Sequence, residues 1–470
     1  MPGNPSLTTF ASLGPPWSLA SLDANFTATA NLLKSVNNYT IYSADSGGAN
    51  SYAATFSAPV TFTLASGVAI MFKAANTNTG ASTLAVNGGA ATPIRNPNGT
   101  ALLPGQIMAG CVVSVLYDGT NWILVGAALS DGPMNQVMNG PFNFLRDTSV
   151  TSHNPTASAV SYLLQRWYNY QVGGVTGDMT VSWLATGPAS DGALTNVNKS
   201  SYANCVRITR NVAATLTDSR FKTVFPTSVS RQLSGRPLQF TFYARAGAGY
   251  SAASLNIVPV VSYGTGSNQS AASQEAGTWT GQTSLYGANL PITTSWQEFT
   301  IITSALPASA TQIALGFQFA WQGVAAANDY VEIAGVRLAA VGATYAPIVE
   351  IPPDEDYMRC LRFFELKSGA SASDASIGSG FFVTTTKAYI HVPFYQKNAI
   401  PSFNVSNVGD FYLQNAAAND VATAFSVPAN TTTLDGLRLN VDIGTPRTAG
   451  QGVLLAANGA AARIYIDADF

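Results

Sequence analysis

Short runs of β-branched and aromatic residues recur from residue 39 to the end of this 470-residue sequence. Examples are residues 68–74, 204–212 and 311–321, which lie in stretches rich in Gly, Asn, Ser and Pro. Runs of the first kind favour strands, and the residues between them favour tight turns. A chain of this length also exceeds what one hydrophobic core usually serves. The sequence therefore predicts an all-β, multidomain fold.

The predicted strands and linkers divide the chain into four segments. A Pro-rich arm precedes a helical pattern, and residues 128–140 form a polar, turn-rich linker. The predicted segments are 1–38, an arm with a short helix; 39–132, a small β domain; 133–350, a jelly-roll β-sandwich; and 351–470, a C-terminal β domain that forms a distal knob.

Residues 19–36 have the seam spacing of a short coiled coil. The intervals alternate between three and four residues along Leu19, Leu22, Phe26, Thr29, Leu33 and Val36. Two heptads are too few to be stable alone, so this helix must pack on copies of itself or on a neighbour. We expect a homotrimer with Leu19, Leu22, Phe26, Leu33 and Val36 at the oligomerisation contact. A lone amphipathic helix on its own domain is the alternative.

Charged residues are sparse, which excludes several classes of partner. Only 10% of the residues are charged and the formal net charge is −2, with Lys and Arg scattered singly. No basic stripe is available to neutralise phosphates, so nucleic acid is not expected as a partner. The sequence has neither an apolar run of about 18 residues nor a basic segment followed by an apolar one at its start. We therefore expect neither membrane insertion nor conventional secretion.

Residues that carry chemistry are few and dispersed. Cys111, Cys205 and Cys360 are widely spaced and match neither a disulfide framework nor a zinc site, so we interpret them as buried thiols. Histidine occurs twice, as His153 in a predicted loop and as His391 in an alternating strand that would point it to solvent or to a subunit contact. No Ser, His and Asp set can be assembled. The sequence predicts no catalytic residues, no cofactor and no enzyme.

The acidic run Asp354-Glu355-Asp356 follows Pro352-Pro353 in a predicted linker. Such a run could supply a cation site or the carboxylate pair of a glycosidase. Three consecutive residues cannot all face one pocket, and acidic residues after proline are typical of a helix start. We interpret the run as a solvated helix N-terminus and predict no metal site, although a structural ion elsewhere remains open.

A resemblance to a known family rests on residues 72–88, FKAANTNTGASTLAVNG. This string resembles a module common in phage tail-fibre and tail-tip proteins. The same module continues with Pro93-Ile94-Arg95 and Asn98-Gly99-Thr100-Ala101-Leu102, and closes with Val115-Leu116-Tyr117-Asp118-Gly119-Thr120-Asn121-Trp122. Its Asn, Asp and Gly residues suit tight turns, and Trp122 is expected in a core or a subunit contact.

A second resemblance covers the predicted sandwich. Its signatures are similar to those of carbohydrate-binding-module-like sandwiches in phage fibres. They are Arg166-Trp167, Leu233-Ser234-Gly235-Arg236 leading into residues 240–246 (FTFYARA), residues 294–299 (TSWQEF), residues 333–338 (IAGVRL) and residues 343–347 (ATYAP). Residues 358–365, MRCLRFFE, then partly resemble the Cys-Gln-Arg-Tyr-Tyr connector that follows this sandwich in fibre proteins.

Aromatic residues beside amides are the candidate ligand-binding residues, because sugars stack on aromatic rings and bind amides through their hydroxyls. One candidate set, Trp279, Gln282, Tyr286 and Asn289, lies in a Gly/Ser/Thr-rich loop. Trp296 occupies a position that resembles a structural residue of the sandwich and is expected in the core. A second candidate pair, Phe411 and Tyr412, follows Asn407 and Asp410; ordinary strand residues are the favoured alternative for this pair.

The resemblances imply a structural subunit of a phage virion, a tail fibre or appendage made in the host cytoplasm. The N-terminal arm would attach a homotrimer to other tail or neck proteins, and the distal β domains would bind a host-surface glycan. One alternative is a purely structural collar, head or adaptor fibre without receptor contact. Another is a tailspike depolymerase, although the sequence lacks the short repeats and carboxylate set expected of such enzymes. A secreted bacterial lectin would require a signal peptide.

Overall fold

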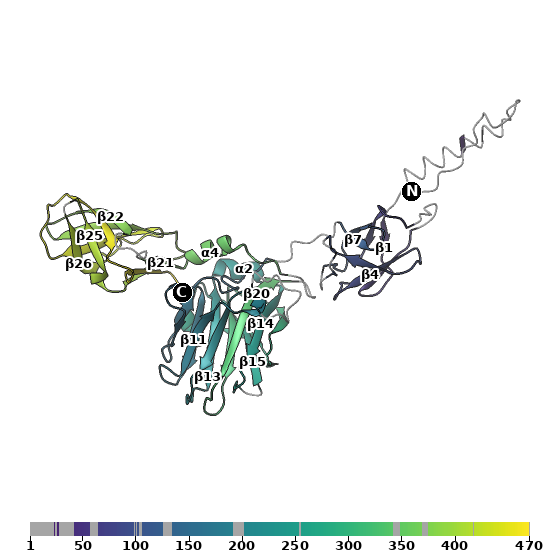
Figure 1. The fold of residues 1–470 in the computed structure, drawn as a ribbon, viewed down its shortest axis with the longest axis horizontal. Coiled ribbons are helices and arrows are strands. Elements are labelled where there is room, and N and C mark those ends of the chain that lie inside the picture. The colour runs from purple at the N-terminus through teal and green to yellow at the C-terminus, as the bar shows by residue number, and fades with distance from the viewer. Residues whose placement is uncertain are drawn as a thin grey trace. The chain divides into compact units, whose positions relative to one another are not determined.

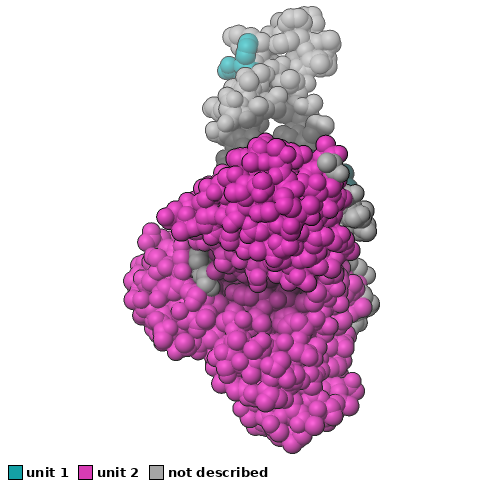
Figure 2. Space-filling model, turned by 90° about the vertical axis from the view of Figure 1, so that its left-hand side faces the viewer, with its two compact units in different colours: residues 1–134, 341–349 teal, residues 135–340, 350–470 magenta. Residues whose placement is uncertain are grey.

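The structure, a computed structural model, describes residues 23, 26–27, 42–56, 64–97, 99, 101–102, 106–125, 134–190, 202–252, 255–341, 348–368, 375–416 and 418–469. Contacts divide the chain into two compact units, which Figure 2 colours differently. Unit 1 comprises Met1–Met134 with Val341–Val349, and unit 2 comprises Asn135–Ala340 with Glu350–Phe470. Strands dominate both units (Figure 1), so the predicted all-β, multidomain class is confirmed.

A single mixed sheet contains all the described strands of unit 1. Its strands are β1 (Tyr42–Ala44), β2 (Ser51–Ala54), β3 (Ala69–Lys73), β4 (Ser82–Val86), β5 (Thr92–Arg95), β6 (Val112–Tyr117) and β7 (Trp122–Leu124), in the order β1-β3-β6-β7-β5-β4-β2. Trp122 is fully buried in the core of this sheet. The Asp118 carboxylate accepts the backbone N–H groups of Thr120 and Asn121 at 2.7 and 2.6 Å, which confirms the predicted tight turn.

Two sheets form the sandwich of unit 2, one in the order β16-β15-β19-β13-β10-β9 and the other in the order β18-β14-β20-β12-β11-β8, with β17 pairing β15. The strands are β8 (Ser152–His153), β9 (Ser161–Leu164), β10 (Trp167–Val172), β11 (Met179–Leu184), β12 (Cys205–Arg210), β13 (Asp218–Phe225), β14 (Pro237–Ala246), β15 (Asn256–Gly264), β16 (Thr283–Gly287), β17 (Leu290–Pro291), β18 (Gln297–Ala305), β19 (Gln312–Ala320) and β20 (Tyr330–Ala340). Helices α2 (Thr227–Leu233) and α3 (Ala271–Glu275) accompany them.

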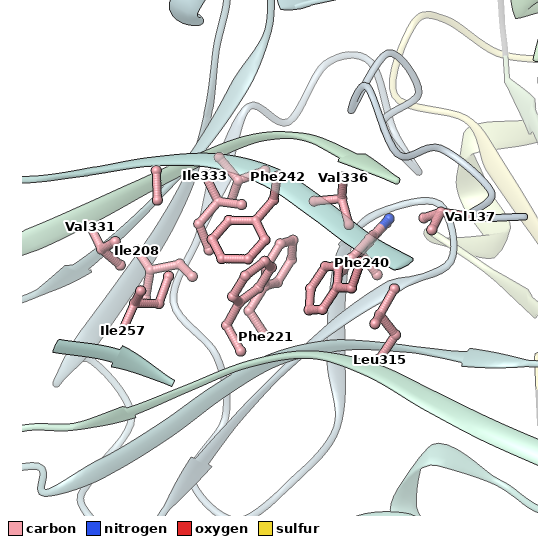
Figure 3. Packing of buried hydrophobic residues seen from close by; sticks show 14 of the residues in the cluster. Val137, Ile208, Phe221, Phe240, Phe242, Ile257, Leu315, Val331, Ile333 and Val336 are labelled. Atoms are coloured by element: carbon pink, nitrogen blue, oxygen red, sulfur yellow. The ribbon is translucent and has the colours of Figure 1, made fainter. Parts of the chain in front are cut away.

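Aromatic rings fill the space between the two sheets (Figure 3). Phe221 and Phe317 come from the first sheet and Phe240 and Phe242 from the second, and all four are at most 1% exposed. The rings of Phe242 and Phe317 lie edge to face with centroids 4.8 Å apart. Because side chains alternate along a strand, the neighbours of these residues point away from the core.

A closed barrel and a three-stranded sheet follow the sandwich within unit 2. The barrel strands, in order of pairing, are β22 (Ser376–Phe382), β23 (Lys387–Pro393), β27 (Gly436–Ile443), β26 (Asn419–Ser426), β25 (Phe411–Gln414) and β28 (Gly452–Ala457). The small sheet has the order β21 (Phe364–Ser368), β29 (Arg463–Asp467) and β24 (Ser402–Val405). Leu439 and Leu455 are fully buried in the barrel core.

Helix α4 (Pro353–Leu361) begins at the acidic run, as predicted, with three carboxylates in its first turn. Asp354 and Glu355 are exposed, but Asp356 is only 3% exposed, so the prediction of a fully solvated run is wrong at this residue. Asp356 points inward because both of its carboxylate oxygens accept the backbone N–H of Asn139.

The predicted trimerising helix falls mostly outside the described residues. Asp23, Phe26 and Thr27 are helical, and Phe26 is 65% exposed. The other predicted contacts, Leu19, Leu22, Leu33 and Val36, lie outside the described part of the chain. Within that part, no helix combines the length and the apolar character needed to span a membrane.

The predicted thiols are free cysteines, of which Cys205 and Cys360 are buried and Cys111 is half-buried. Burial raises the pKa of Cys205 to about 12. Among the described residues, no group of three or more His, Cys, Asp and Glu side chains is arranged to hold a metal ion.

Candidate binding face of the sandwich

The outward face of the first sandwich sheet carries a row of four side chains from four adjacent strands. The strand registers pair Tyr170 with Arg220, Arg220 with Gln318, and Gln318 with Val258. All four side chains alternate with core residues and are half-buried. We call these four residues the open row.

The next row toward α3 is largely covered. It consists of Tyr168, Lys222, Gly316 and Val260, paired in the same way. A Cβ atom at Gly316 would lie 2.2 Å from the carbonyl oxygen of Phe221 and 2.6 Å from the Cα of Lys222, so only glycine permits this close approach.

The segment of residues 265–282, which contains α3, covers the far end of the same face. Ala271 and Trp279 of this segment pack on Tyr168, Val224 and Ala314 in one buried cluster. Ser270 caps α3 by accepting the backbone N–H of Ser273. Glu275, the last residue of α3, lies where this covering segment meets the open row, and its carboxylate accepts from Arg220.

Glu275 is the centre of a charged network under the edge of this cover. Its Oε1 accepts the Tyr168 hydroxyl at 2.7 Å and lies 2.9 Å from Nζ of Lys222. Its Oε2 accepts from Arg220, which also bonds to Asp218 at 3.0 Å. The Glu275 side chain is 1% exposed, whereas Arg220 keeps 22% exposure. The network therefore fixes Arg220 on the sheet face with part of its side chain open to solvent.

The electrostatics of this network keep the charges in place. Burial opposes the charge on Arg220, but the bonds to Glu275 and Asp218 outweigh it and raise the pKa of Arg220. Burial lowers the pKa of Lys222, an effect that the Glu275 carboxylate partly offsets. Burial, followed by the Glu275 charge, holds the pKa of the Tyr168 hydroxyl well above its usual value.

The open row presents an aromatic ring, a cation and an amide side by side. The Arg220 guanidinium lies 5.9 Å from the centre of the Tyr170 ring. The Gln318 amide donates to Asp218 at 3.2 Å and leaves its carbonyl oxygen for other donors. A ring face flanked by charged and amide groups suits a hydroxyl-rich ligand.

The loop set predicted from sequence is not brought together as an exposed site. Trp279 is 3% exposed, and its indole N–H donates to the carbonyl oxygen of Ser270 at 2.9 Å, so this candidate ring is not open to a ligand. Both polar atoms of the Gln282 amide are hydrogen-bonded. Its nitrogen donates to the backbone carbonyl of Gln274, and its oxygen accepts the backbone N–H of Trp279. Tyr286 is half-buried against the sandwich core, and Asn289 is exposed between β16 and β17.

The second predicted pair lies in the barrel wall. Phe411 is fully buried and Tyr412 is 4% exposed, so the alternative of ordinary strand residues is confirmed. Trp296 is 6% exposed beneath the Arg245 guanidinium, as its structural interpretation predicts. His391 is exposed on β23, whereas His153 belongs to the short strand β8 rather than to a loop.

Sequence reasoning missed Tyr170, Arg220 and Gln318. A signal was present, because polar residues alternate with phenylalanine in residues 219–225 and 315–319. That alternation places Arg220 and Gln318 on the outward face, but only the register between strands shows that they neighbour each other and Tyr170.

The chain matches no known protein-family model and no curated protein. Solved structures similar to parts of it include a CBM4 carbohydrate-binding module, at TM-score 0.25 and 15% identity, covering 43% of this chain and 98% of that one. The enzymatically active domain of a Bacteriophage CBA120 tailspike protein gives TM-score 0.27 and 15% identity, covering 57% of this chain and 29% of that one. A Stig cyclase from Fischerella sp. TAU gives TM-score 0.29 and 14% identity, covering 45% and 100%. At such TM-scores these similarities assign neither a family nor a function.

Proposed function

We propose that this chain is a subunit of a phage virion fibre or appendage that attaches to a host-surface glycan without cleaving it. The observation that carries the glycan site is the open row, in which Tyr170, Arg220 and Gln318 lie side by side on a sheet face that α3 leaves uncovered. The phage origin rests on the resemblance of residues 72–88 and of the modules that follow them.

In this proposal the chain forms a homotrimer through residues 19–36, and its N-terminal arm binds other tail or neck proteins. Three open rows per fibre would strengthen weak single-site binding without new contacts. The mass in solution tests the assembly, because a trimer has a mass three times that of the 48.9 kDa chain.

The test of the site compares binding of the wild type and two variants to an array of bacterial surface polysaccharides. Tyr170→Ala removes the stacking ring and should weaken binding about tenfold or more. Gln318→Ala removes an amide at the far side of Arg220 and should weaken it several-fold.

Tyr395→Ala provides the matched control, because Tyr395 is an exposed tyrosine (37%) of the C-terminal domain. Its binding should equal that of the wild type. Unchanged binding by Tyr170→Ala would rule out the open row as the glycan site. Release of reducing ends from a bound polysaccharide would show a depolymerase instead, and absence of binding to cell-surface glycans would favour a structural collar or adaptor.

A further inference from the structure

Four side chains that can react with one another meet where α3 packs on the sandwich face. Tyr168 comes from β10, Lys222 from β13, and Gln274 and Glu275 from α3. The side chains of Lys222 and Glu275 are 6% and 1% exposed, and Tyr168 and Gln274 are also buried. We call these four residues the Lys222 cluster. Its burial keeps most water away from an amine, an amide, a carboxylate and a hydroxyl that lie in contact.

The Lys222 amine is held beside the side-chain amide of Gln274. Its Nζ lies 3.4 Å from Oε1 of Gln274 and 2.9 Å from Oε1 of Glu275. Gly316 leaves room for the lysine stem, because a Cβ atom there would lie 2.8 Å from Cγ of Lys222. A nucleophile fixed next to a carbonyl group in this way needs no bimolecular encounter to react with it.

The Tyr168 hydroxyl is placed to polarise the Gln274 carbonyl. It lies 2.9 Å from Oε1 of Gln274 and 2.7 Å from Oε1 of Glu275. Burial, followed by the Glu275 charge, holds the pKa of this hydroxyl well above its usual value, so it keeps its proton. When Glu275 is protonated, the hydroxyl can turn this hydrogen to the Gln274 oxygen and stabilise negative charge that develops there.

Glu275 occupies the position of a general base. Arg220 bonds to its Oε2, which leaves Oε1 against the Lys222 amine. Burial lowers the pKa of Lys222, an effect that the Glu275 charge partly offsets, so loss of a proton to Glu275 is easier than in water. The ion-paired Glu275 carboxylate is a poor electrophile, whereas the Gln274 amide is neutral. The amide is therefore the group that the amine attacks.

We propose that Lys222 and Gln274 join in an isopeptide bond after the chain folds, with Glu275 and Tyr168 as catalytic residues. Glu275 takes one proton from the Lys222 ammonium, and the electron pair of the neutral amine forms a bond to Cδ of Gln274. The Cδ–Nε2 bond breaks, a second amine proton moves to Nε2, and ammonia leaves. Ammonia then takes the proton from Glu275, which restores the carboxylate. The structure shows the four groups before this reaction.

The bond fastens α3 to β13 and so fixes the segment that covers this end of the sandwich face. Covalent braces of another kind are absent from the described part of the chain, because its cysteines are free. A cross-link between residues 222 and 274 also restrains the unfolded chain, as a disulfide does. This inference does not depend on glycan binding by the open row, because the bond forms without a ligand.

Intact-mass spectrometry of the full chain tests the bond. The wild type should be lighter than its sequence requires by about 17 Da, the mass of ammonia. Lys222→Met and Gln274→Ala each remove one reacting group and should show no deficit. Glu275→Gln keeps the size of the side chain but removes the base, so its deficit should develop at least about a hundredfold more slowly.

Two comparisons serve as controls. Gln322→Ala, at an exposed glutamine after β19, should keep the full deficit. In a proteolytic digest of the wild type, the peptides of Lys222 and Gln274 should be recovered as one cross-linked species. Lys397 should be recovered unlinked, because it pairs with Glu365 at 2.7 Å but has no side-chain amide among its described contacts.

The wild-type mass alone can overturn the proposal, whether or not the variants fold. A wild type at the mass of its sequence would mean that the Lys222 cluster is an ordinary ion pair. A deficit of about 18 Da, the mass of water, would place the link at Glu275 rather than at Gln274. Neither mass depends on binding of a polysaccharide, so the open row is tested separately.

Discussion

Asp356 joins two segments of unit 2 that are distant in sequence. The backbone N–H of Asn139 donates to both of its carboxylate oxygens, at 3.1 and 2.9 Å. The side chain of Asn139 then donates to the carbonyl oxygens of Phe144 and Gln165. Burial raises the pKa of Asp356 to about 6, because one hydrogen bond does not replace the lost hydration of a carboxylate.

The raised pKa of Asp356 predicts a pH dependence of stability. The folded chain holds this proton more tightly than the unfolded chain, so the stabilisation is full below pH 3.8 and is lost as the pH rises through about 6. Relative to Asp356→Asn, the wild type should lose up to about 3 kcal/mol of unfolding free energy between these values. Urea unfolding followed by tryptophan fluorescence at a series of pH values measures the difference.

Asp354→Asn is the control for this pH series, since Asp354 is exposed in the same helical turn. The stability of Asp354→Asn should follow that of the wild type at every pH. Parallel curves for the wild type and Asp356→Asn would contradict the assignment of the titration to Asp356.

At the scale of elements, β13 and β19 approach each other closely because Gly316 has no side chain. A Cβ at this position would meet the backbone of Phe221 and Lys222, which cannot move without breaking the sheet register. Gly316→Ala should therefore destabilise the sandwich by about 2–4 kcal/mol, measured by chemical denaturation. Gly452→Ala in β28 is the matched control, because its Cβ would meet nothing within 4 Å, and it should change stability by less than about 1 kcal/mol.

Strands with strong apolar alternation could be predicted from the sequence, including one that carries a partly exposed arginine, Arg207 of β12. Residues 311–321 and 204–212 were predicted as strands and form β19 and β12. By contrast β13 was not among the strands singled out, and the burial of Lys222 on it depends on Glu275 of another segment, which pairs with Arg220 and Lys222. This ion pairing depends on tertiary contacts, which local sequence does not contain.

The open row was also missed, because its residues come together only through tertiary structure. Composition around Trp279 suggested an exposed loop, yet the segment folds back onto the sheet and buries the ring. The open row required the register of four strands, which period-2 alternation alone does not determine.

At the scale of the whole molecule, buried ion pairs attach the C-terminal domain to the sandwich within unit 2. Asp469 accepts from both Arg146 and Arg166, and its side chain is 5% exposed. Arg166 is 3% exposed and lies 3.8 Å from the centre of the Phe363 ring. Burial lowers the pKa of Arg166 to about 10, so this guanidinium remains charged at pH 7 and depends on its carboxylate.

Asp469→Ala should loosen this attachment, because it leaves the buried Arg166 cation without its carboxylate. Removal of one partner from a buried pair costs about 3–5 kcal/mol. Amides of β21 and β29 should then exchange with deuterium at least about a hundredfold faster, measured by hydrogen exchange and mass spectrometry, while those of β6 in unit 1 stay unchanged.

Asp442→Ala is the control, since its pair with Lys387 spans 3.5 Å and both side chains are at least 33% exposed. An exposed pair contributes under about 1 kcal/mol, so exchange in this control should match the wild type. Equal protection of β29 in Asp469→Ala and wild type would mean that hydrophobic contacts such as those of Cys360 and Phe363 hold the two parts together instead.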